Sequence, residues 1–359
     1  MISVTLGKMV SLCYNISIMK NYIVFDLEWN QSANGKERSI PHFPFEIIEI
    51  GAVKLNETFQ MVDEFHRLIR PQVYTQMHHA ISEVTHMDMK ELRNSGELFP
   101  DAAADFLSWC GGDAVFCTWG NMDLLELQRN MDYYHMDNPF PKPLFYYVQK
   151  LYGLFCRENA RISLDSAVEE QSLLENRPFH RALDDAYYTG KLLTMLGHEP
   201  GPDTILPFLS VDYYRLPADK KEEIRMTFPG YSKYVSRIFD TKEDAMEDKG
   251  VTEMMCYRCG RMLRKKVRWF TPNQKTYFAL ACCPEHGYLK GKIRMKKVEE
   301  ESVFVVKTLK LTDEEGAQNI IQRKEDVRKK RAERNRMKRR QKQAQKKAVS
   351  TSRCTKKLP

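Results

Sequence analysis

Two carboxylates stand in a segment near the start of the chain that otherwise has the composition of a buried strand. The segment Tyr22–Trp29 reads YIVFDLEW, and Asp26 and Glu28 interrupt its apolar residues. Because successive side chains of a strand point to opposite faces, these two carboxylates share one face. Their like charges repel each other, and burial makes that repulsion costly unless a cation lies between them. The segment is therefore either an edge strand with a solvated acidic face or one wall of a cation site.

Strand-like and helix-like segments alternate from residue 21 to about residue 198. Three consecutive runs rich in Ile and Val come first, NYIVFDLEWN, EIIEIGAVKLN and DEFHRLIRP, and AVFCTWG forms a fourth. Helical spacing of apolar residues marks DAAADFLSWC, NMDLLELQRNMDYY, SLDSAVEEQSLL and HRALDDAYYTGKLLTML. Strands interleaved with helices predict a layered domain of the α/β or α+β class over residues 19–200.

Charge is distributed unevenly along the chain. Residues 1–250 carry a formal charge of −12, residues 251–300 +8, residues 301–322 −2 and residues 323–359 +14. A polyanion would be attracted to the basic C-terminal part and would need a cation to approach the acidic N-terminal part. No run approaches the roughly 18 apolar residues of a membrane span, so no membrane partner is expected.

Residues 1–18 precede a second methionine, Met19, which stands directly before the first strand-like run. They contain no pronounced basic segment and no small-residue cleavage site, so a secretory signal peptide is not expected. We expect residues 1–18 to be a non-native or disordered extension outside the fold.

Two later segments carry acids that could meet the first pair. TWGNMDLLEL places Asp123 in the first turn of a helix, where an Asp ordinarily interacts with the helix dipole. FHRALDDAYY places His180 five residues before Asp185, and positions five apart on a helix differ in direction by about 140°. His180 can therefore approach the same site as Asp185 only from a loop before the helix. Taken singly, Asp184 and Asp185 have the pattern of surface charges.

Taken in order, these segments resemble the DEDDh exonucleases, the DnaQ-like branch of the RNase H-like fold, over about residues 21–196. FDLEWN matches the first motif, TWGNMDLLEL the second, and HRALDDA the third with its spacing intact. The subgroup that trims RNA 3′ ends, which includes the histone-mRNA and RNA-interference-regulating exonucleases, is the most similar. The resemblance implies an α/β fold with a mixed sheet and flanking helices. It also implies a 3′–5′ exonuclease that releases nucleoside 5′-monophosphates from single-stranded nucleic acid, RNA in preference to DNA.

The same resemblance assigns roles to the residues of the motifs. Asp26, Glu28, Asp123 and Asp185 would be the ligands of two Mg²⁺ or Mn²⁺ ions, which prefer carboxylate oxygens. Paired divalent ions would also supply the cations that the first two carboxylates require. His180 would be the general base that takes a proton from the attacking water, because an imidazole titrates near neutral pH.

The chain departs from the family at two positions. Trp29 follows the first motif's Glu, where many members have Thr. In ISEVTHMDMKEL, which looks like the Thr-Gly-Ile segment that holds the terminal nucleotide, His86 replaces the Gly. Both departures concern the shape of the pocket for the 3′ end, and therefore its nucleotide preference.

The nine cysteines divide into scattered thiols and one cluster. The scattered ones, Cys13, Cys110, Cys117, Cys156 and Cys354, suit buried thiols of a reducing compartment, and a cytoplasmic location is expected. CYRCG and CPEHG are two similar turns with ligand-like spacing, and each has a glycine after its second ligand to allow the tight turn. They predict a structural zinc ion, with a reduced metal-free pair of turns as the alternative. The predicted ligands are Cys256, Cys259, Cys283 and His286, since Cys282 would break the spacing to His286.

The remaining C-terminal residues fall into three segments. Residues 201–250 are rich in turn signals and predict a linker with a short helix that starts after Thr241. Residues 251–312 predict a zinc-ribbon-like domain of short strands. Residues 313–359 end in a polar, strongly basic run without an apolar stripe, so we expect a solvated helix or a disordered arm.

Basic and aromatic residues alternate between the two cysteine turns, in RMLRKKVRWFTPNQKTYFAL. Cations on phosphates and aromatic rings under bases would make a surface for single-stranded nucleic acid. The alternative is that the aromatic residues, Trp269, Phe270, Tyr277 and Phe278, form the core of a small domain. The basic tail would add affinity for nucleic acid regardless of its sequence, dock on a ribonucleoprotein, or act as a nuclear localisation signal.

Two other functions remain compatible with the same motifs. One is a nucleic-acid-binding adaptor whose nuclease domain has lost its activity, although all four carboxylates and His180 are present. The other is a proofreading exonuclease of a DNA polymerase assembly.

Overall fold

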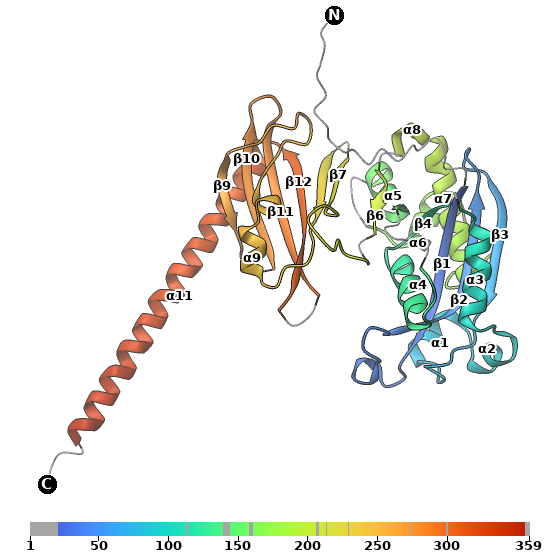
Figure 1. The fold of residues 1–359 in the computed structure, drawn as a ribbon, viewed down its shortest axis with the longest axis horizontal. Coiled ribbons are helices and arrows are strands. Elements are labelled where there is room, and N and C mark those ends of the chain that lie inside the picture. Colours follow the sequence, from blue (N-terminus) through green and yellow to red (C-terminus); the bar gives the residue numbers. More distant parts are fainter. Residues whose placement is uncertain are drawn as a thin grey trace, which may run out of the picture. The chain divides into compact units, whose positions relative to one another are not determined.

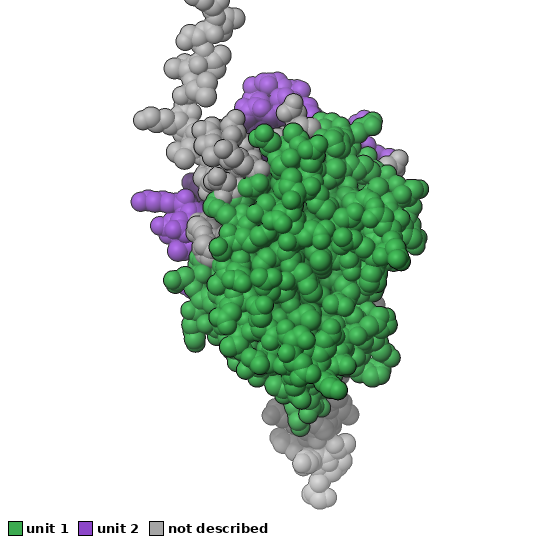
Figure 2. Space-filling view, turned by 90° about the vertical axis from the view of Figure 1, so that its right-hand side faces the viewer, with its two compact units in different colours: residues 1–215 green, residues 216–359 purple. Residues whose placement is uncertain are grey.

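The computed structural model describes residues 21–112, 114–138, 144–157, 161–205, 208–212, 214–228, 230–273, 275–298 and 301–355. The expected extension, residues 1–18, lies outside these described residues. The chain divides into two units, residues 1–215 and residues 216–359, which Figure 2 draws in green and purple. Each unit contains its own six-stranded sheet (Figure 1).

The first sheet has the strand order β3-β2-β1-β4-β5-β6. Strand β1 pairs antiparallel with β2 and parallel with β4, so the sheet is mixed and the unit is of the α/β class, as predicted. Strand β5 continues the sheet in parallel with β4, and β6 closes it in an antiparallel sense. The strands are β1 (Asn21–Gln31), β2 (Phe45–Leu55), β3 (Met61–Leu68), β4 (Ala114–Thr118), β5 (Leu144–Tyr147) and β6 (Ser210–Val211).

Helices cover both faces of this sheet (Figure 1). Alternate residues of β1 pack in different cores: Tyr22 and Val24 lie with the long helix α7, and Ile23 and Phe25 lie with α3 and α4. By the same alternation, the even-numbered carboxylates of β1 face α7. The helices are α1 (His79–Thr85), α2 (Met89–Ser95), α3 (Phe99–Cys110), α4 (Met122–Tyr133), α5 (Val148–Cys156), α6 (Leu164–Glu170), α7 (Ala182–His198) and α8 (Pro202–Ile205), with a 3₁₀ turn at Gly35–Arg38.

The second unit is built on an antiparallel sheet with the order β7-β8-β12-β11-β10-β9. Its strands are β7 (Ile224–Phe228), β8 (Tyr231–Val235), β9 (Lys265–Phe270), β10 (Thr276–Cys283), β11 (Gly287–Lys297) and β12 (Val303–Thr312). Two short helices, α9 (Lys242–Glu247) and α10 (Lys249–Thr252), precede β9, and the long helix α11 (Glu314–Thr355) follows β12. Of the two forms expected for the basic tail, the structure therefore has the helix.

Residues 201–250 differ from the linker that their sequence suggests. Strands β7 and β8 lie in this range, pair with each other, and extend the second sheet through β12. Strands β7 and β8 thus form an antiparallel pair where the turn-rich sequence suggested a linker. The predicted short helix is α9, where the Thr241 hydroxyl accepts from the Asp244 N–H and Asp244 accepts from the Thr241 N–H, a capping box.

Within the described part of the chain, no helix has both the length and the apolar character needed to cross a membrane.

Candidate active site

Strand β1 places two acids on the face that α7 covers. Asp26 and Glu28 are both half-buried, and a bulge in the pairing with β2 follows directly after Glu28. Together with Asp185 of α7 they offer carboxylate oxygens that lie within 4.8 Å of one another. Two segments more than 150 residues apart in the sequence therefore meet at one acidic site.

Asp123 joins this group from the start of α4. It is 5% exposed, and its carboxylate accepts hydrogen bonds from its own backbone N–H and from that of Leu27 in β1. Its charge acts on Asp26, Glu28 and Asp185. The position expected from sequence, in the first turn after a strand, thus brings the fourth carboxylate within electrostatic range of the other three, although it is outside the group whose oxygens lie within 4.8 Å.

Gly51 allows α7 to approach the sheet closely enough to bring Asp185 to this site. It pairs directly with Asp26 across the β1–β2 ladder. A Cβ atom at residue 51 would lie 2.0 Å from the backbone nitrogen of Leu183 and 2.1 Å from the carbonyl carbon of Ala182. These neighbours are backbone atoms, so the first turn of α7 can rest here only on a glycine.

Burial and neighbouring acids raise the pKa values of all four carboxylates. Burial, followed by the charges of the neighbouring acids, raises the pKa of Asp26 well above its usual range and that of Glu28 to about 9. Burial is also the main cause that raises the pKa of Asp185 to about 7 and that of Asp123 to about 6. Four ionised groups are therefore unfavourable here without added positive charge. A cluster of hard oxygen donors with excess negative charge fits divalent cations such as Mg²⁺ or Mn²⁺.

Comparison with known proteins finds relatives of the first unit among nucleases. Residues 23–193 match the model of the RNase T family, described as exonuclease. These residues are therefore similar to the exonuclease domains of that family. Over 199 residues, the chain is 27% identical to the probable 3′-5′ exonuclease KapD of Bacillus subtilis (strain 168), and the match covers 51% of this chain and 90% of KapD.

Two solved structures are similar to the exonuclease domain. One is a full-length 3′-exonuclease, with 21% identity and a TM-score of 0.43 over 51% of this chain and 83% of that one. The other is the nuclease domain of 3′hExo, a DEDDh family member, with 23% identity and a TM-score of 0.42 over 51% of this chain and 94% of that one.

His180 lies in the loop directly before α7 of the exonuclease domain, where the sequence required it to be. Its side chain is exposed, and its backbone N–H donates to both carboxylate oxygens of Asp185, at 3.3 and 3.2 Å. Its φ angle of 65° is in the left-handed region, which His adopts more readily than most residues. This bend keeps the backbone of His180 against the acidic site and leaves the imidazole facing solvent.

Glu49 of β2 is a residue of this site that the sequence reasoning missed. It is 1% exposed, and its carboxylate accepts from Nε2 of His66 at 2.7 Å, from Arg181 at 2.9 Å and from the backbone N–H of Ala182 at 3.1 Å. Burial opposes its ionisation, but the hydrogen bonds from His66 and Arg181 hold the pKa of Glu49 below its ordinary value. Glu49 therefore fixes the start of α7. The sequence contained a signal that could have identified Glu49, because this residue, like Asp26, interrupts an apolar central strand.

The residues just before the segment that resembles the family's nucleotide-holding motif are hydrogen-bonded to Asn30 at the end of β1. The Asn30 amide donates to the carbonyl oxygens of Tyr74 and Gln76, at 2.8 and 2.9 Å, and its oxygen accepts from the His78 N–H. His86 ends α1 with a φ of 56°, a conformation that favours glycine. The structure thus gives a reason for the glycine that the family has at this position.

We expect Gly51→Ala to misplace α7 and reduce turnover. Forcing a methyl group against backbone costs about 1–3 kcal/mol of stability, and a displacement of about 1 Å at a catalytic site can cost about a hundredfold in rate. Thermal unfolding and turnover measure the two effects. Gly112→Ala is the matched control, because a Cβ there meets nothing within 4 Å. Equal behaviour of the two variants would contradict the role given to Gly51.

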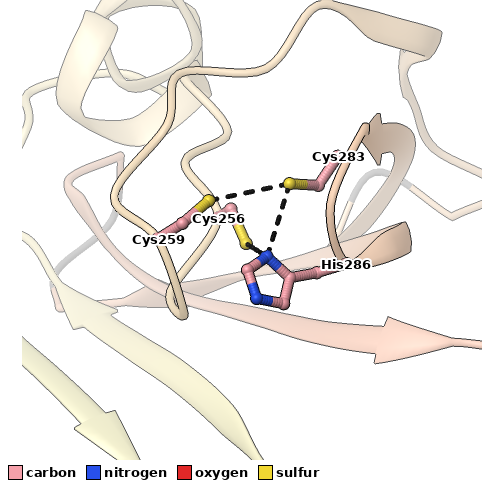
Figure 3. A group of neighbouring side chains, drawn as sticks. All are labelled: Cys256, Cys259, Cys283 and His286. Carbon is pink, nitrogen blue, oxygen red and sulfur yellow. Dashed lines mark hydrogen bonds between the residues drawn. The ribbon is translucent and has the colours of Figure 1, made fainter.

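The second unit holds the predicted cluster of cysteines and histidine (Figure 3). The Nδ1 atom of His286 lies 3.7 Å from Sγ of Cys256 and 3.6 Å from Sγ of Cys283, and the Sγ atoms of Cys259 and Cys283 are 3.6 Å apart. All four ligand atoms lie within 4.8 Å of one another. Tetrahedral zinc, with bonds of about 2.0–2.3 Å, separates its ligands by about 3.4–3.8 Å, so the cluster has the dimensions of a zinc site.

The backbone of the two turns also agrees with the sequence interpretation. Gly260 and Gly287, which follow the second ligand of each turn, have φ angles of 69° and 80°. Cys282 is outside the group of four, and its thiol lies 3.8 Å from the carbonyl oxygen of Cys283. Adjacent residues of a strand point to opposite faces, which explains why only one of these two cysteines reaches the site.

The aromatic residues between the turns belong to the core of the second unit and are not exposed platforms. Phe270 is 9% exposed and packs with Phe278 against α11. Trp269 packs in the core on the other face of the sheet and donates to the carbonyl oxygen of Thr252 at 2.7 Å. Tyr277 is partly buried in the same layer. These rings fill the cores on the two faces of the six-stranded sheet. They are therefore not available to stack on the bases of a nucleic acid.

Proposed function

We propose that this protein is a metal-dependent 3′–5′ exonuclease of single-stranded nucleic acid, RNA in preference to DNA, that releases nucleoside 5′-monophosphates. The observation that carries the proposal is the convergence of Asp26, Glu28 and Asp185 on one point, with Asp123 beside them, inside an exonuclease domain. The name of the relative KapD supports the 3′–5′ direction. The sequence resemblance to the RNA-trimming subgroup supports RNA as the substrate.

The four carboxylates would hold two Mg²⁺ or Mn²⁺ ions. Bound ions of this kind stabilise charge on the attacking and leaving oxygens of an in-line displacement. His180 accepts a proton from the attacking water as the new O–P bond forms. The bond between phosphorus and the 3′ oxygen of the preceding nucleotide then breaks, that oxygen takes a proton from solvent, and the terminal nucleotide leaves as a 5′-monophosphate. Glu49 and Arg181 keep the loop of His180 in position.

Turnover of oligonucleotides with a 5′ label tests this proposal directly. RNA and DNA of one sequence, single- and double-stranded, are incubated with Mg²⁺, and an Asp26→Asn variant is the control for a contaminating nuclease. The proposal expects a ladder shortened from the 3′ end, faster for single-stranded RNA, with nucleoside 5′-monophosphate as product. Intact RNA with either Mg²⁺ or Mn²⁺ would instead favour a binding adaptor, and a preference for mismatched DNA ends would favour proofreading.

We further propose that Cys256, Cys259, Cys283 and His286 bind a structural zinc ion, since four protein ligands leave no open position. The described cysteines are all free thiols, which suits a reducing, cytoplasmic environment. The basic tail would bind nucleic acid or dock on a ribonucleoprotein.

We expect Cys256→Ser to remove the zinc ion and to destabilise the second unit. The protein should contain about one zinc ion per chain, and removal of a ligand should lower both the zinc content and the unfolding temperature of this unit. Metal analysis and calorimetry check both effects. Cys282→Ser is the matched control, because its thiol is outside the cluster. An equal fall in zinc content in the two variants, or no zinc in the purified protein, would contradict the assignment.

A further inference from the structure

One face of the second sheet is covered by helices α9 and α10 and by the cysteine turns. The core on that face contains Leu289, Ile293 and Met295 of β11. Side chains alternate along a strand, so the intervening residues of β11 point to the opposite face. Four of these, Lys290, Lys292, Arg294 and Lys296, are cationic, and the ammonium of Lys296 lies over the ring of Phe304.

The strand register adds further cations to this face. Lys310 of β12 lies directly opposite Lys290, and Thr308 lies opposite Lys292. On β8, Tyr231 and Lys233 continue the same two rows. Arg294 and Lys310 are exposed, and Lys290 and Lys292 are half-exposed. We call the four residues Lys290, Lys292, Arg294 and Lys310 the basic sheet face.

The neighbouring strands offer no carboxylate to balance this charge. Strands β8, β11 and β12, all of whose residues the structure describes, contain no Asp or Glu, although exposed strands commonly pair opposite charges. Burial, together with the charges of Arg294 and of Arg323 in α11, lowers the pKa of Lys292. The cations therefore repel one another, and an anionic partner would relieve this repulsion.

Helix α11 divides this face of the sheet into an apolar and a basic part. Its residues Ala317 and Ile320 pack on Val267, Phe270 and Leu280, which belong to β9 and β10. The guanidinium of Arg323 lies over the ring of Phe278, at 4.2 Å, next to the basic sheet face. The apolar half is thus covered by the chain itself, and the helix that covers it leads into the segment with a charge of +14.

We propose that the basic sheet face binds the phosphate backbone of a single-stranded nucleic acid. The choice of this partner rests on the proposed exonuclease function, and charge complementarity supports it independently. Because Trp269 and Phe270 are packed in the core and this face is lined by cations, the protein is expected to contact phosphates, and binding should be insensitive to base sequence. The face would hold the body of a strand apart from the chemistry at its 3′ end.

Replacing all four cations of the face by Gln tests this proposal in the full-length chain. Binding is measured with a fluorescent single-stranded oligomer over a range of salt concentrations, in an Asp26→Asn background that leaves the strand uncut. We expect binding at low salt to weaken by about tenfold or more, and the slope of log K against log salt to fall by about 0.7 for each phosphate that is no longer neutralised. A matched variant with Gln at four other exposed cations of this unit, Lys221, Lys249, Arg258 and Lys275, should bind as before.

A second comparison separates a charge effect from misfolding. Replacing the three lysines of the face by Arg should preserve affinity, and the Gln variant should retain its zinc ion and its unfolding temperature. An equal fall in affinity in the two Gln variants would mean a diffuse charge effect and overturn the proposal. Unchanged affinity of the variant with Gln on the basic sheet face would also overturn the proposal. The same holds if this variant loses more affinity for duplexes than for single strands.

The p-nitrophenyl ester of a nucleoside 5′-monophosphate distinguishes this inference from the proposed function. It has a single phosphate and no further backbone for the basic sheet face to bind, so the wild-type chain and the face variant, both with Asp26 intact, should hydrolyse it at equal rates. No hydrolysis by either protein would count against the exonuclease, whereas equal rates together with unchanged strand binding would count against the basic sheet face alone.

Discussion

Replacing Asp26 by Asn is expected to abolish turnover and to stabilise the metal-free protein. The two effects have one cause, because Asp26 is buried among acids that repel it unless cations are present. Removal of charge stabilisation worth about 3 kcal/mol or more corresponds to a fall in turnover of about a hundredfold or more. Each kcal/mol of relieved repulsion should raise the unfolding temperature of the metal-free domain by about 2–4 °C.

Added metal should reverse the order of stability of these two proteins. An ion that binds only the folded state stabilises it by about 2.7 kcal/mol at a concentration of a hundred times its Kd. Mg²⁺ or Mn²⁺ should therefore raise the unfolding temperature of the wild-type protein more than that of Asp26→Asn, measured by calorimetry. Asp165→Asn is a control on α6, because this acid is outside the cluster. A metal-free Asp26→Asn that is less stable than wild type would show that Asp26 does not experience this repulsion.

His180→Ala is expected to reduce turnover by about 10²- to 10⁴-fold while leaving substrate affinity intact, because a general base acts on the proton transfer. The backbone hydrogen bonds of His180 to Asp185 do not depend on the side chain. Single-turnover rates and equilibrium binding separate the two quantities.

Two controls test whether the imidazole itself is responsible. His180→Gly fits the positive φ of this residue without strain, and its turnover should fall as far as that of His180→Ala. Imidazole added to the solution should restore part of the rate of the glycine variant. If His180→Gly retained near-wild-type turnover, the effect of His180→Ala would come from backbone strain and the general base would lie elsewhere.

The acids of the site were named from the sequence by the resemblance of three segments to the motifs of a known family, and local backbone patterns support part of that set. The alternation of YIVFDLEW places Asp26 and Glu28 on one face, and the strand-to-helix boundary before Asp123 predicts its position. The loop position of His180 followed from helical geometry, since five residues do not return to the same face. The period of the backbone alone did not single out Asp185, which the resemblance to the third motif identified.

Local sequence patterns could not predict interactions between segments that are far apart in the sequence. The need for glycine at residue 51 arises from the backbone of Leu183, more than a hundred residues later. Glu49 had a visible signal as an acid in an apolar strand, but its partner Arg181 comes from another element. In the second unit, burial of Phe270 in β9 depends on helix α11, which follows only after β12. Tertiary packing decides each of these features.

The most direct test of this account is a crystal structure of the wild-type protein grown with Mn²⁺ and a nucleoside 5′-monophosphate, with data collected at the manganese absorption edge. The account predicts two anomalous peaks about 4 Å apart among the carboxylates of Asp26, Glu28, Asp123 and Asp185. Carboxylates that hold no manganese at a saturating concentration would contradict it.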